Sequence, residues 1–532
     1  MNYAAAAIAI DSAALMTQLR GDLGAEFVLD AMDKRVFFST DIAAEGQVVQ
    51  YVIQPGSPAE LSLAVGHCTQ AGATVVPRGG GFSYTGGYTP TTVDTVMVDM
   101  RRMDSIVEIN TEDMYVTVEC GCTWKKLYDA LKAKGYRTPY FGPMSGFWAT
   151  VGGALSQGSF FLGSTEHGVV AESVLSMDIV LADGTLISTG SAGGAGVSPF
   201  YRWYGPDLTG LFLSDNGALG FKTSVTLRLI RWPEHQRFGT FAFDQMPDAL
   251  RLVSEVGRER LAAECYCWDP TFVKSVGQNS GRVQDLKYMA GVVGSGSSLM
   301  QGLKDAARMA IAGKRIFNGS TYLVHVSIDE MSDAAAEEKL KRVQALAAKC
   351  GGGEVEASAP RATRAIPFVD FKNSGVAETG IRNLPTNALC PHSGAQALAK
   401  AVQGFFDERR ARLEADGLTY GVIAFAVGAN AICIEPLIFW NDQRHKLHDR
   451  VKESSDLAKL AAFGGPTPAS LSALEIRKEL VQLFTSLGCV HVQIGKSYPY
   501  QSTRAAGTLS VITAIKAALD PRRLMNPGAL GL

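Results

Sequence analysis

A glycine-rich stretch at Val76–Gly87, with the sequence VPRGGGFSYTGG, has the residue types that most directly indicate chemistry. It places five glycines around one arginine, after a short apolar run that is typical of a β-strand. Because glycines lack Cβ atoms, consecutive backbone N–H groups in such a loop can converge on an anion. The stretch therefore predicts a site at a strand end for the two phosphates of a dinucleotide.

Two other interpretations of this stretch were weighed. Its glycine spacing differs from the G-x-G-x-x-G pattern of nicotinamide dinucleotide sites, and no acidic residue follows at the distance that a βαβ unit requires. These differences disfavour a Rossmann domain. Taken alone, the stretch also fits a tight turn without a ligand.

A second segment poor in charge and rich in small residues, Gly142–Gly168, follows further along the chain. Two shorter motifs come after it, LADG at Leu181–Gly184 and LDPRRLMNPG at Leu519–Gly528. Taken in this order with Val76–Gly87, these segments resemble the FAD-binding domain of the vanillyl-alcohol oxidase and p-cresol methylhydroxylase (PCMH) superfamily. The resemblance covers Val48–Pro233 and the last few dozen residues.

This resemblance implies FAD as the cofactor and an α+β fold. A two-subdomain FAD-binding domain of the PCMH type would carry an inserted α+β substrate (cap) domain. The predicted divisions are residues 40–233 for the FAD-binding domain, 234–490 for the substrate domain, and 491–532 for a tail that returns to the first domain. The residues expected to bind FAD are Pro77, Arg78, Gly79, Gly80, Gly81, Phe82, Ser83, Gly86, Pro143, Thr150, Gly152, Gly153, Ser156, Gly158, Gly163, His167, Gly168, Val170, Gly220 and Asn526.

Candidate catalytic residues come first from the C-terminal region. In the related enzymes that oxidise phenols and benzylic alcohols, Tyr and Arg residues near the C-terminus stabilise a phenolate. The comparable segment here, Lys496–Arg504, offers Tyr498, Tyr500 and Arg504, although its Tyr-to-Arg spacing departs from the adjacent pair typical of that branch. We expect Tyr500 to take a proton and Arg504 to steady negative charge, with a surface position as the alternative for Arg504.

Histidine and basic residues supply further candidates. His392 and His491 lie where the substrate domain should meet the flavin, and a histidine can accept a hydroxyl proton near neutral pH. The alternative for each is a structural histidine. A basic run suits either a substrate carboxylate or a solvated face, and it consists of Arg361, Arg364, Lys372 and Arg382.

An apolar strand at Ile434–Asp442 carries two further candidates for the lining of the pocket, Glu435 and Trp440. Packing in the core is the alternative for Trp440. Several aromatic residues in or beside the flavin-proximal segments either favour a ring-bearing substrate or pack against the cofactor, namely Tyr84, Tyr88, Tyr140, Phe141 and Trp148.

The function that this pattern predicts is an FAD-dependent oxidoreductase. It would transfer a hydride from an aromatic alcohol or a 4-alkylphenol to flavin N5. A D-2-hydroxy acid (lactate-like) dehydrogenase is the nearest alternative, since Gly205–Gly220 resembles both branches. A redox-neutral transferase of the alkylglycerone-phosphate synthase type and a noncatalytic flavin-binding subunit also stay open.

Two features narrow the cofactor chemistry. In the berberine-bridge-like branch a histidine that bonds to flavin follows PRGGG, and here that residue is Phe82, so this covalent link is not expected. A link through a His or Tyr of the substrate domain stays open. Metal-assisted relatives use His-rich motifs where this chain has Phe425–Pro436 and His491–Gly495 without the paired ligands, so no metal is predicted.

Composition is consistent with a large enzyme that acts on a small molecule. The chain has 532 residues, and 50 basic against 52 acidic residues give a net charge of −2, which disfavours binding to nucleic acid. The N-terminus lacks the basic residues of a signal peptide, and no apolar run approaches about 18 residues, so no transmembrane segment is expected. Nine scattered cysteines suit reduced thiols in the cytoplasm. The resemblance adds a homodimer, with oxygen, a cytochrome or a quinone as electron acceptor.

The elements that position these residues follow from local patterns. In the first half, the patterns predict strands at Val48–Ile53 and Thr74–Pro77, a helix from the Ser57 cap to Gly72, a hairpin of Ile106–Ile109 with Tyr115–Cys120, a helix capped by Thr123 and a hairpin turn at Asp183-Gly184. In the second half, they predict helices at Asp333–Lys349, Gly394–Glu414 and Leu471–Leu487, with apolar strand-like runs at Thr321–Ile328 and Gly421–Ile438.

Overall fold

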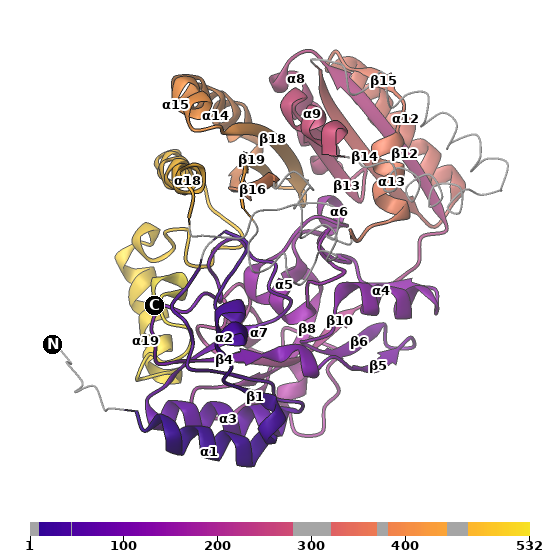
Figure 1. Cartoon of the computed structure of the whole chain (residues 1–532). Coiled ribbons are helices and arrows are strands. Elements are labelled where there is room, and N and C mark those ends of the chain that lie inside the picture. The colour runs from indigo at the N-terminus through magenta and orange to yellow at the C-terminus, as the bar shows by residue number, and fades with distance from the viewer. Residues whose placement is uncertain (1–9, 44, 280–320, 370–380, 444–465) are drawn as a thin grey trace.

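The computed structural model describes residues 10–43, 45–279, 321–369, 381–443 and 466–532. Its lower half in Figure 1 holds two sheets made from the first 231 residues, and its upper half holds one large sheet with helices on the outside. The C-terminal segment runs back to the lower half. This arrangement confirms the predicted α+β fold class.

The first sheet carries the glycine loop at one strand end. Its strand order is β1-β2-β4-β3, and β2, β4 and β3 are parallel. Helix α1 packs on α3, and β1 pairs with β2, so residues before the predicted boundary at 40 also belong to this layer. The elements are α1 (Ser12–Leu23), β1 (Val28–Leu29), α2 (Met32–Phe38), β2 (Tyr51–Ile53), α3 (Pro58–Ala71), β3 (Thr74–Arg78) and β4 (Thr95–Asp99).

The second sheet is antiparallel, in the order β5-β6-β10-β8-β9. Helix α5, which lies within the second glycine segment, packs against β10 of this sheet. The strands are β5 (Ile106–Asn110), β6 (Tyr115–Glu119), β8 (Val174–Val180), β9 (Leu186–Ser188) and β10 (Phe221–Arg228), with β7 (Tyr136–Arg137) and β11 (Ile230–Arg231) pairing apart from them. The helices are α4 (Trp124–Lys132), α5 (Val151–Gln157), α6 (Ser164–His167) and α7 (Leu208–Leu211).

The third sheet is antiparallel and has eight strands, in the order β15-β12-β14-β13-β18-β19-β16, with β17 also paired to β19. The chain enters it just after residue 234. The strands are β12 (His235–Phe243), β13 (Glu264–Trp268), β14 (Tyr322–Glu330), β15 (Gly353–Val355), β16 (Ile381–Pro385), β17 (Ala388–Pro391), β18 (Thr419–Val427) and β19 (Ala431–Asn441).

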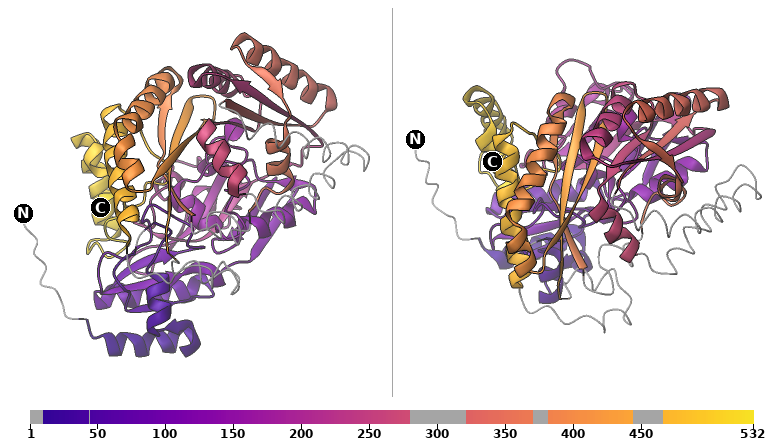
Figure 2. Two further views of the ribbon diagram at one scale, coloured as in Figure 1. Left: turned by 45° about the horizontal axis from the view of Figure 1, so that its top comes forward. Right: turned by 90° about the horizontal axis from the view of Figure 1, so that it is seen from above.

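Most helices of this half cover one face of this sheet, and the other face points toward the first domain, with Phe272 of α9 (Pro270–Asn279) packed on it. In the turned views of Figure 2, α14 (Ala395–Glu408) and α18 (Pro468–Ser486) stay beside the orange strands, and both contact β19. Strand residues alternate between the faces, so Ile434 and Ile438 join the helix-covered core, whereas Cys433 and Leu437 face the first domain. The helices of this half are α8 (Met246–Arg258), α9 (Pro270–Asn279), α12 (Asp333–Lys349), α13 (Ser358–Ala365), α14 (Ala395–Glu408), α15 (Arg410–Ala415), α18 (Pro468–Ser486) and α19 (Ala506–Leu519).

A buried ionic cluster joins the two halves. Arg137 of β7 pairs with Asp329 of β14 at 2.9 Å, and Arg364 of α13 pairs with the same carboxylate at 3.1 Å. Arg364 also pairs with Glu264 of β13, which accepts a hydrogen bond from the Gly163 N–H at 2.8 Å. The two arginines hold the pKa of Asp329 below its usual range despite its burial. Charges buried in this way need their partners, so the cluster fixes the large sheet over the first domain.

Most of the predicted elements are confirmed. Helix α3 has the expected Ser57 cap, because Ser57 accepts from the Glu60 N–H, whereas Glu60 reaches back to the Gly56 N–H instead of the Ser57 N–H. Gly72 ends the helix in a left-handed conformation. The predicted Asp333–Lys349 helix has the same bounds in the structure.

Two predictions about the second half were too coarse. The single helix predicted over Gly394–Glu414 is divided at Arg409, whose backbone leaves the helical conformation. The apolar run Gly421–Ile438 forms two strands, because the left-handed Gly428 allows a tight turn between them. Strands β12 and β13 were not predicted.

Candidate functional site

The loop after β3 forms one wall of a cavity. Gly79, Gly80 and Gly81 follow the last residue of the strand and line that cavity. A Cβ atom at Gly79 would collide with the Thr150 side chain, and one at Gly80 would collide with the Trp148 carbonyl oxygen. The loop therefore passes too close to the second glycine segment for any other residue at these two positions, and it brings backbone without side chains to the cavity wall.

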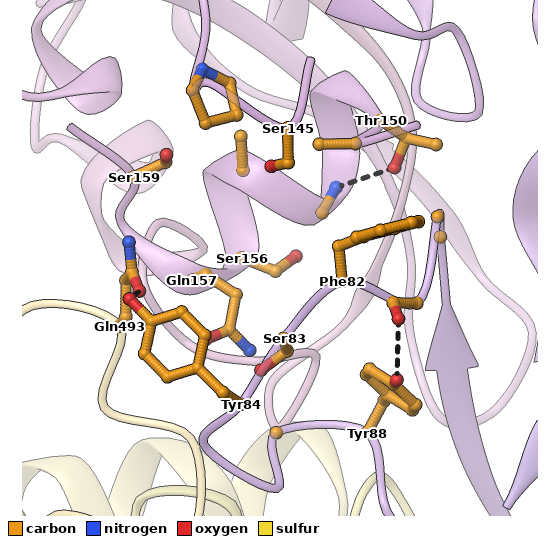
Figure 3. A pocket seen from close by; sticks show the side chains of 18 of the residues that line it. Phe82, Ser83, Tyr84, Tyr88, Ser145, Thr150, Ser156, Gln157, Ser159 and Gln493 are labelled. Atoms are coloured by element: carbon orange, nitrogen blue, oxygen red, sulfur yellow. Dashed lines mark hydrogen bonds between the residues drawn. The ribbon is translucent and has the colours of Figure 1, made fainter. Parts of the chain in front are cut away.

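The second glycine segment forms the adjoining wall, through Pro143, Ser145 and the start of α5. Thr150 caps α5 by accepting a hydrogen bond from the Gly153 N–H at 3.2 Å, as drawn in Figure 3. Gly152 lies against Cys120, where a Cβ atom would collide. Both walls are thus made of backbone and small side chains, and they fit an extended cofactor.

The C-terminal tail holds the glycine loop in place. The Asn526 backbone N–H donates to the Val75 carbonyl oxygen at 2.8 Å. The buried Asn526 side chain donates to the carbonyl oxygens of Gly87 and Asn216. Asn526 therefore acts behind the cavity wall, and the tail positions β3 and its loop.

The opposite wall is the free face of the eight-stranded sheet. Ile423 and Phe425 of β18 and Leu437 of β19 line the cavity from this side. Phe160 and Phe161 of the second glycine segment meet the Phe425 ring edge-on, at centroid distances of 5.4 and 5.6 Å. Such packing excludes water and favours a substrate with apolar surface.

Polar groups on this side are few. The buried Glu435 side chain lines the cavity from β19, and its Oε1 has no hydrogen-bond partner among the described residues. Burial raises the pKa of Glu435 to about 7. Tyr84 donates a hydrogen bond to Gln493 Oε1 at 2.7 Å, and Figure 3 shows the two side chains together at the cavity. Burial and the nearby Glu435 raise the pKa of Tyr84 well above its usual value.

The structure places the predicted FAD residues in two groups. The first group lines the cavity and consists of Pro77, Gly79, Gly80, Gly81, Phe82, Ser83, Pro143, Thr150, Gly152, Gly153, Ser156 and Gly220. The second group lies outside the lining and consists of Arg78, Gly86, Gly158, Gly163, His167, Gly168, Val170 and Asn526.

Arg78 illustrates the second group. Its fully buried guanidinium lies over the rings of Phe37, Phe38 and Tyr88, at 4.8 to 5.1 Å from their centroids. Burial lowers its pKa. Arg78 therefore anchors the end of β3 in aromatic packing behind the loop.

None of the four predicted catalytic residues lines the cavity. His491 contacts the Asn387 carbonyl oxygen and stacks on Tyr498, and burial lowers its pKa. His392 contacts the Ala429 carbonyl oxygen beyond the β18–β19 turn.

Tyr500 and Arg504 form a local pair, with the guanidinium 5.1 Å from the ring centroid. Arg504 also donates to the Thr503 hydroxyl. Nothing in this geometry joins the pair to the cavity.

The basic run does not form an anion site among its described members. Arg364 belongs to the buried ionic cluster between the domains. Arg382 pairs with Asp442 at 3.4 Å, and Arg361 lies over the Phe238 ring. Lys372 lies outside the described residues.

Phe82 lines the cavity and stacks on Trp148 at a centroid distance of 6.1 Å.

Within the described ranges, no group of three or more His, Cys, Asp or Glu side chains is arranged to hold a metal ion. The described part of the chain also contains no helix that is long and apolar enough to cross a membrane.

Comparison with known proteins supports FAD as the cofactor. Residues 49–190 match the FAD binding domain family, and residues 495–530 match the C-terminal domain of FAD linked oxidases. The chain therefore contains an FAD binding domain and a segment like the C-terminal domain of FAD linked oxidases. The two matched regions of this FAD-linked protein meet in the structure, where the tail joins β3.

Curated relatives of this FAD-linked protein include D-lactate dehydrogenase [cytochrome] 1, mitochondrial, of Saccharomyces cerevisiae. It is 29% identical over 222 residues, which are 41% of this chain and 36% of that protein. Glycolate oxidase subunit GlcD of Bacillus subtilis is 30% identical over 234 residues, 44% of this chain and 48% of that one. The matched regions thus span about a third to a half of these relatives.

Solved structures share the fold along nearly the whole chain. p-Cresol methylhydroxylase with bound substrate has a TM-score of 0.71 at 17% identity, covering 98% of this chain and 96% of that one. 4-Ethylphenol oxidase from Gulosibacter chungangensis, in an isoeugenol complex, has 0.70 at 19%, covering 98% and 97%. An alkyldihydroxyacetonephosphate synthase has 0.66 at 14%, covering 97% and 86%.

Only some of the polar cavity residues could be recognised from the sequence. Glu435 was predicted to line the pocket, and the structure places it there, because an acidic residue stands out in an otherwise apolar strand. Trp440 lies on the helix-covered face, which was the alternative. Gln493 and Asn383 line the cavity without any local signal.

Proposed function

We propose that the protein is an FAD-dependent oxidoreductase that oxidises an aromatic alcohol or a 4-alkylphenol. The observation that carries this proposal is a single cavity whose lining runs from the Gly79–Gly81 loop to the apolar face of β18 and β19. Bound FAD would supply the acceptor for a hydride. The protein would supply the cradle for the cofactor and an apolar, water-poor space for the substrate.

The charge of the cavity supports a neutral substrate. Among the described lining residues, the carboxyl group is that of Glu435 on the large sheet, and the phenol of Tyr84 lies on the glycine loop. Lys222 lies on the side of the second sheet, where it pairs with Asp215 at 2.6 Å. A substrate carboxylate beside Glu435 would meet a like charge, whereas the hydroxyl of an alcohol or phenol could donate to it.

A D-2-hydroxy acid dehydrogenase is the second candidate, and the named D-lactate dehydrogenase and glycolate oxidase relatives favour it. A group transferase is favoured only by likeness of fold to the synthase. An oxidoreductase differs from a transferase in that its substrate reduces the bound flavin.

The test is an anaerobic absorbance titration of the purified holoprotein. Parallel samples receive 4-ethylphenol, vanillyl alcohol and D-lactate. Bleaching of the flavin by the aromatic compounds is expected. Bleaching by D-lactate alone would instead support the second candidate, and a flavin that none of them bleaches would contradict the proposal.

A homodimer, a location in the cytoplasm, and oxygen, a cytochrome or a quinone as acceptor complete the proposed function. Some relatives are named as mitochondrial, so the proposed location in the cytoplasm needs its own test. Light scattering of the holoprotein and reoxidation of reduced flavin by each acceptor class would test the other two.

A further inference from the structure

Glu435 is the only carboxyl group among the described residues that line the cavity. The position of Glu435 in the sheet is set by its pairing with Ile423 of β18, and Pro436 follows it in β19. Cys433 and Leu437, two residues away on either side, belong to the apolar cluster on the cavity face. The register therefore holds the carboxyl group toward the space where a substrate would lie.

The carboxyl group is also incompletely satisfied. A buried polar atom without a partner is costly and uncommon in native proteins, and Glu435 Oε1 is such an atom within the part of the chain that the structure describes. Burial raises the pKa of this carboxyl group to about 7. An acceptor of this kind at a cavity wall suits a hydroxyl group that the substrate brings.

The groups around Glu435 would leave it as the residue that titrates near neutral pH. Tyr84 faces it from the glycine loop, Cys433 from its own strand, and Tyr498 from the C-terminal segment. Burial raises the pKa of Tyr498 to about 12 and raises those of Tyr84 and Cys433 well above their usual values. The Arg477 guanidinium lies over the Tyr498 ring, 5.5 Å from its centroid, and donates to the Tyr84 carbonyl oxygen.

We propose that Glu435 is the general base that accepts the hydroxyl proton of the substrate. This role rests on the proposed function. As the C–H bond breaks and its electron pair leaves with the hydrogen for the FAD, the O–H bond breaks and its proton bonds to a Glu435 oxygen. An alcohol becomes a carbonyl compound, and a 4-alkylphenol becomes a quinone methide. Two electrons and one proton reach the cofactor, and one proton stays on Glu435 until it passes to solvent.

The first test measures proton exchange without turnover. Phenol has no benzylic C–H bond to oxidise, so its binding to the holoprotein is followed by calorimetry in two buffers of different ionisation enthalpy. Glu435 is protonated below pH 7, and a phenol hydroxyl that donates to its carboxylate would favour the ionised form. Binding should therefore release up to about one proton per site well below pH 7 and none well above it.

Two variants complete this test. Glu435→Gln should release no proton at either pH, whereas the matched control Glu338→Gln, on the exposed side of α12, should behave as the wild type. A wild type that releases no proton below pH 7, or a Glu435→Gln variant that still releases it, would overturn the role of Glu435.

The second test separates this role from the proposed function. Anaerobic reduction of the flavin by 4-ethylphenol or vanillyl alcohol should slow by about 100-fold or more in Glu435→Gln, with unchanged flavin content. The wild-type rate should fall as the pH drops through about 7. A wild type reduced at a rate independent of pH and equal to that of the variant would overturn only the role of Glu435. A wild type not reduced by any alcohol would overturn the proposed function, and the base with it.

Discussion

The two walls of the cavity are built differently. The wall that we propose for the flavin consists of consecutive glycines and small residues whose backbones nearly touch, as where Gly80 meets the Trp148 carbonyl. The substrate-side wall consists of single side chains from separate strands, such as Asn383, Phe425 and Glu435. The first wall depends on the absence of side chains and suits a large invariant cofactor, whereas the second depends on their identity and can select a substrate.

Breaking the cluster that holds the two walls together should have the largest effect. Arg364→Met leaves Glu264 without its cation in a buried site, and we expect the free energy of unfolding to fall by about 3–5 kcal/mol. Urea denaturation at neutral pH measures it. Arg258→Met, at an exposed i, i+3 pair on α8, is the control and should change little. Equal stability of both variants would show that the domain junction does not depend on the cluster.

The second largest effect should come from filling the glycine wall, which should abolish the retention of FAD. Gly80→Val places a branched side chain against the Trp148 carbonyl, and about 3 kcal/mol of overpacking corresponds to a loss of FAD affinity of about 100-fold. Flavin absorbance after gel filtration measures retention. Gly404→Val, on α14 with open space around it, is the control. Full flavin content in Gly80→Val would remove the loop from the cofactor site.

Changing a polar group at the edge of both walls should have a smaller effect. Tyr84→Phe removes only the hydroxyl that donates to Gln493, so flavin content should be unchanged while reduction by 4-ethylphenol slows about 2- to 10-fold. Tyr204→Phe, on an exposed loop, serves as the control. If Tyr84→Phe lost its flavin instead, Tyr84 would belong to the cofactor wall.

The smallest effect should come from the C-terminal pair. Arg504 contacts Tyr500 and Thr503 and does not line the cavity, so Arg504→Ala should keep its flavin. We expect 4-ethylphenol to reduce that flavin at a rate within about twofold of the wild-type rate. Stopped-flow absorbance measures this rate. A loss of about 100-fold, the size expected of a group that stabilises charge in the transition state, would return Arg504 to the site.

The same contrast explains how far the sequence could predict the site. Contiguous glycines such as Gly79–Gly81 report a close approach of backbone directly, and the Ser57 and Gly72 caps are equally local, so the cofactor loop and α3 were predictable. Gln493 and Asn383 reach the cavity only through the pairing of distant segments. The four predicted catalytic residues were chosen for chemical type, and their surroundings in the fold placed them elsewhere.

Burial likewise decides roles that sequence leaves open. In the sequence, Arg364 could not be distinguished from a basic residue on the surface. In the structure it is buried, and its two carboxylate partners come from β13 and β14. Arg78 carried the signal of a phosphate ligand, but three aromatic rings behind the loop surround it.

The most direct measurement is a crystal structure of the holoprotein with phenol bound. The account predicts the FAD pyrophosphate at the Gly79–Gly81 loop and the phenol hydroxyl within hydrogen-bonding distance of Glu435, against Phe425 and Leu437. FAD bound away from that loop, or phenol bound outside the cavity, would contradict it.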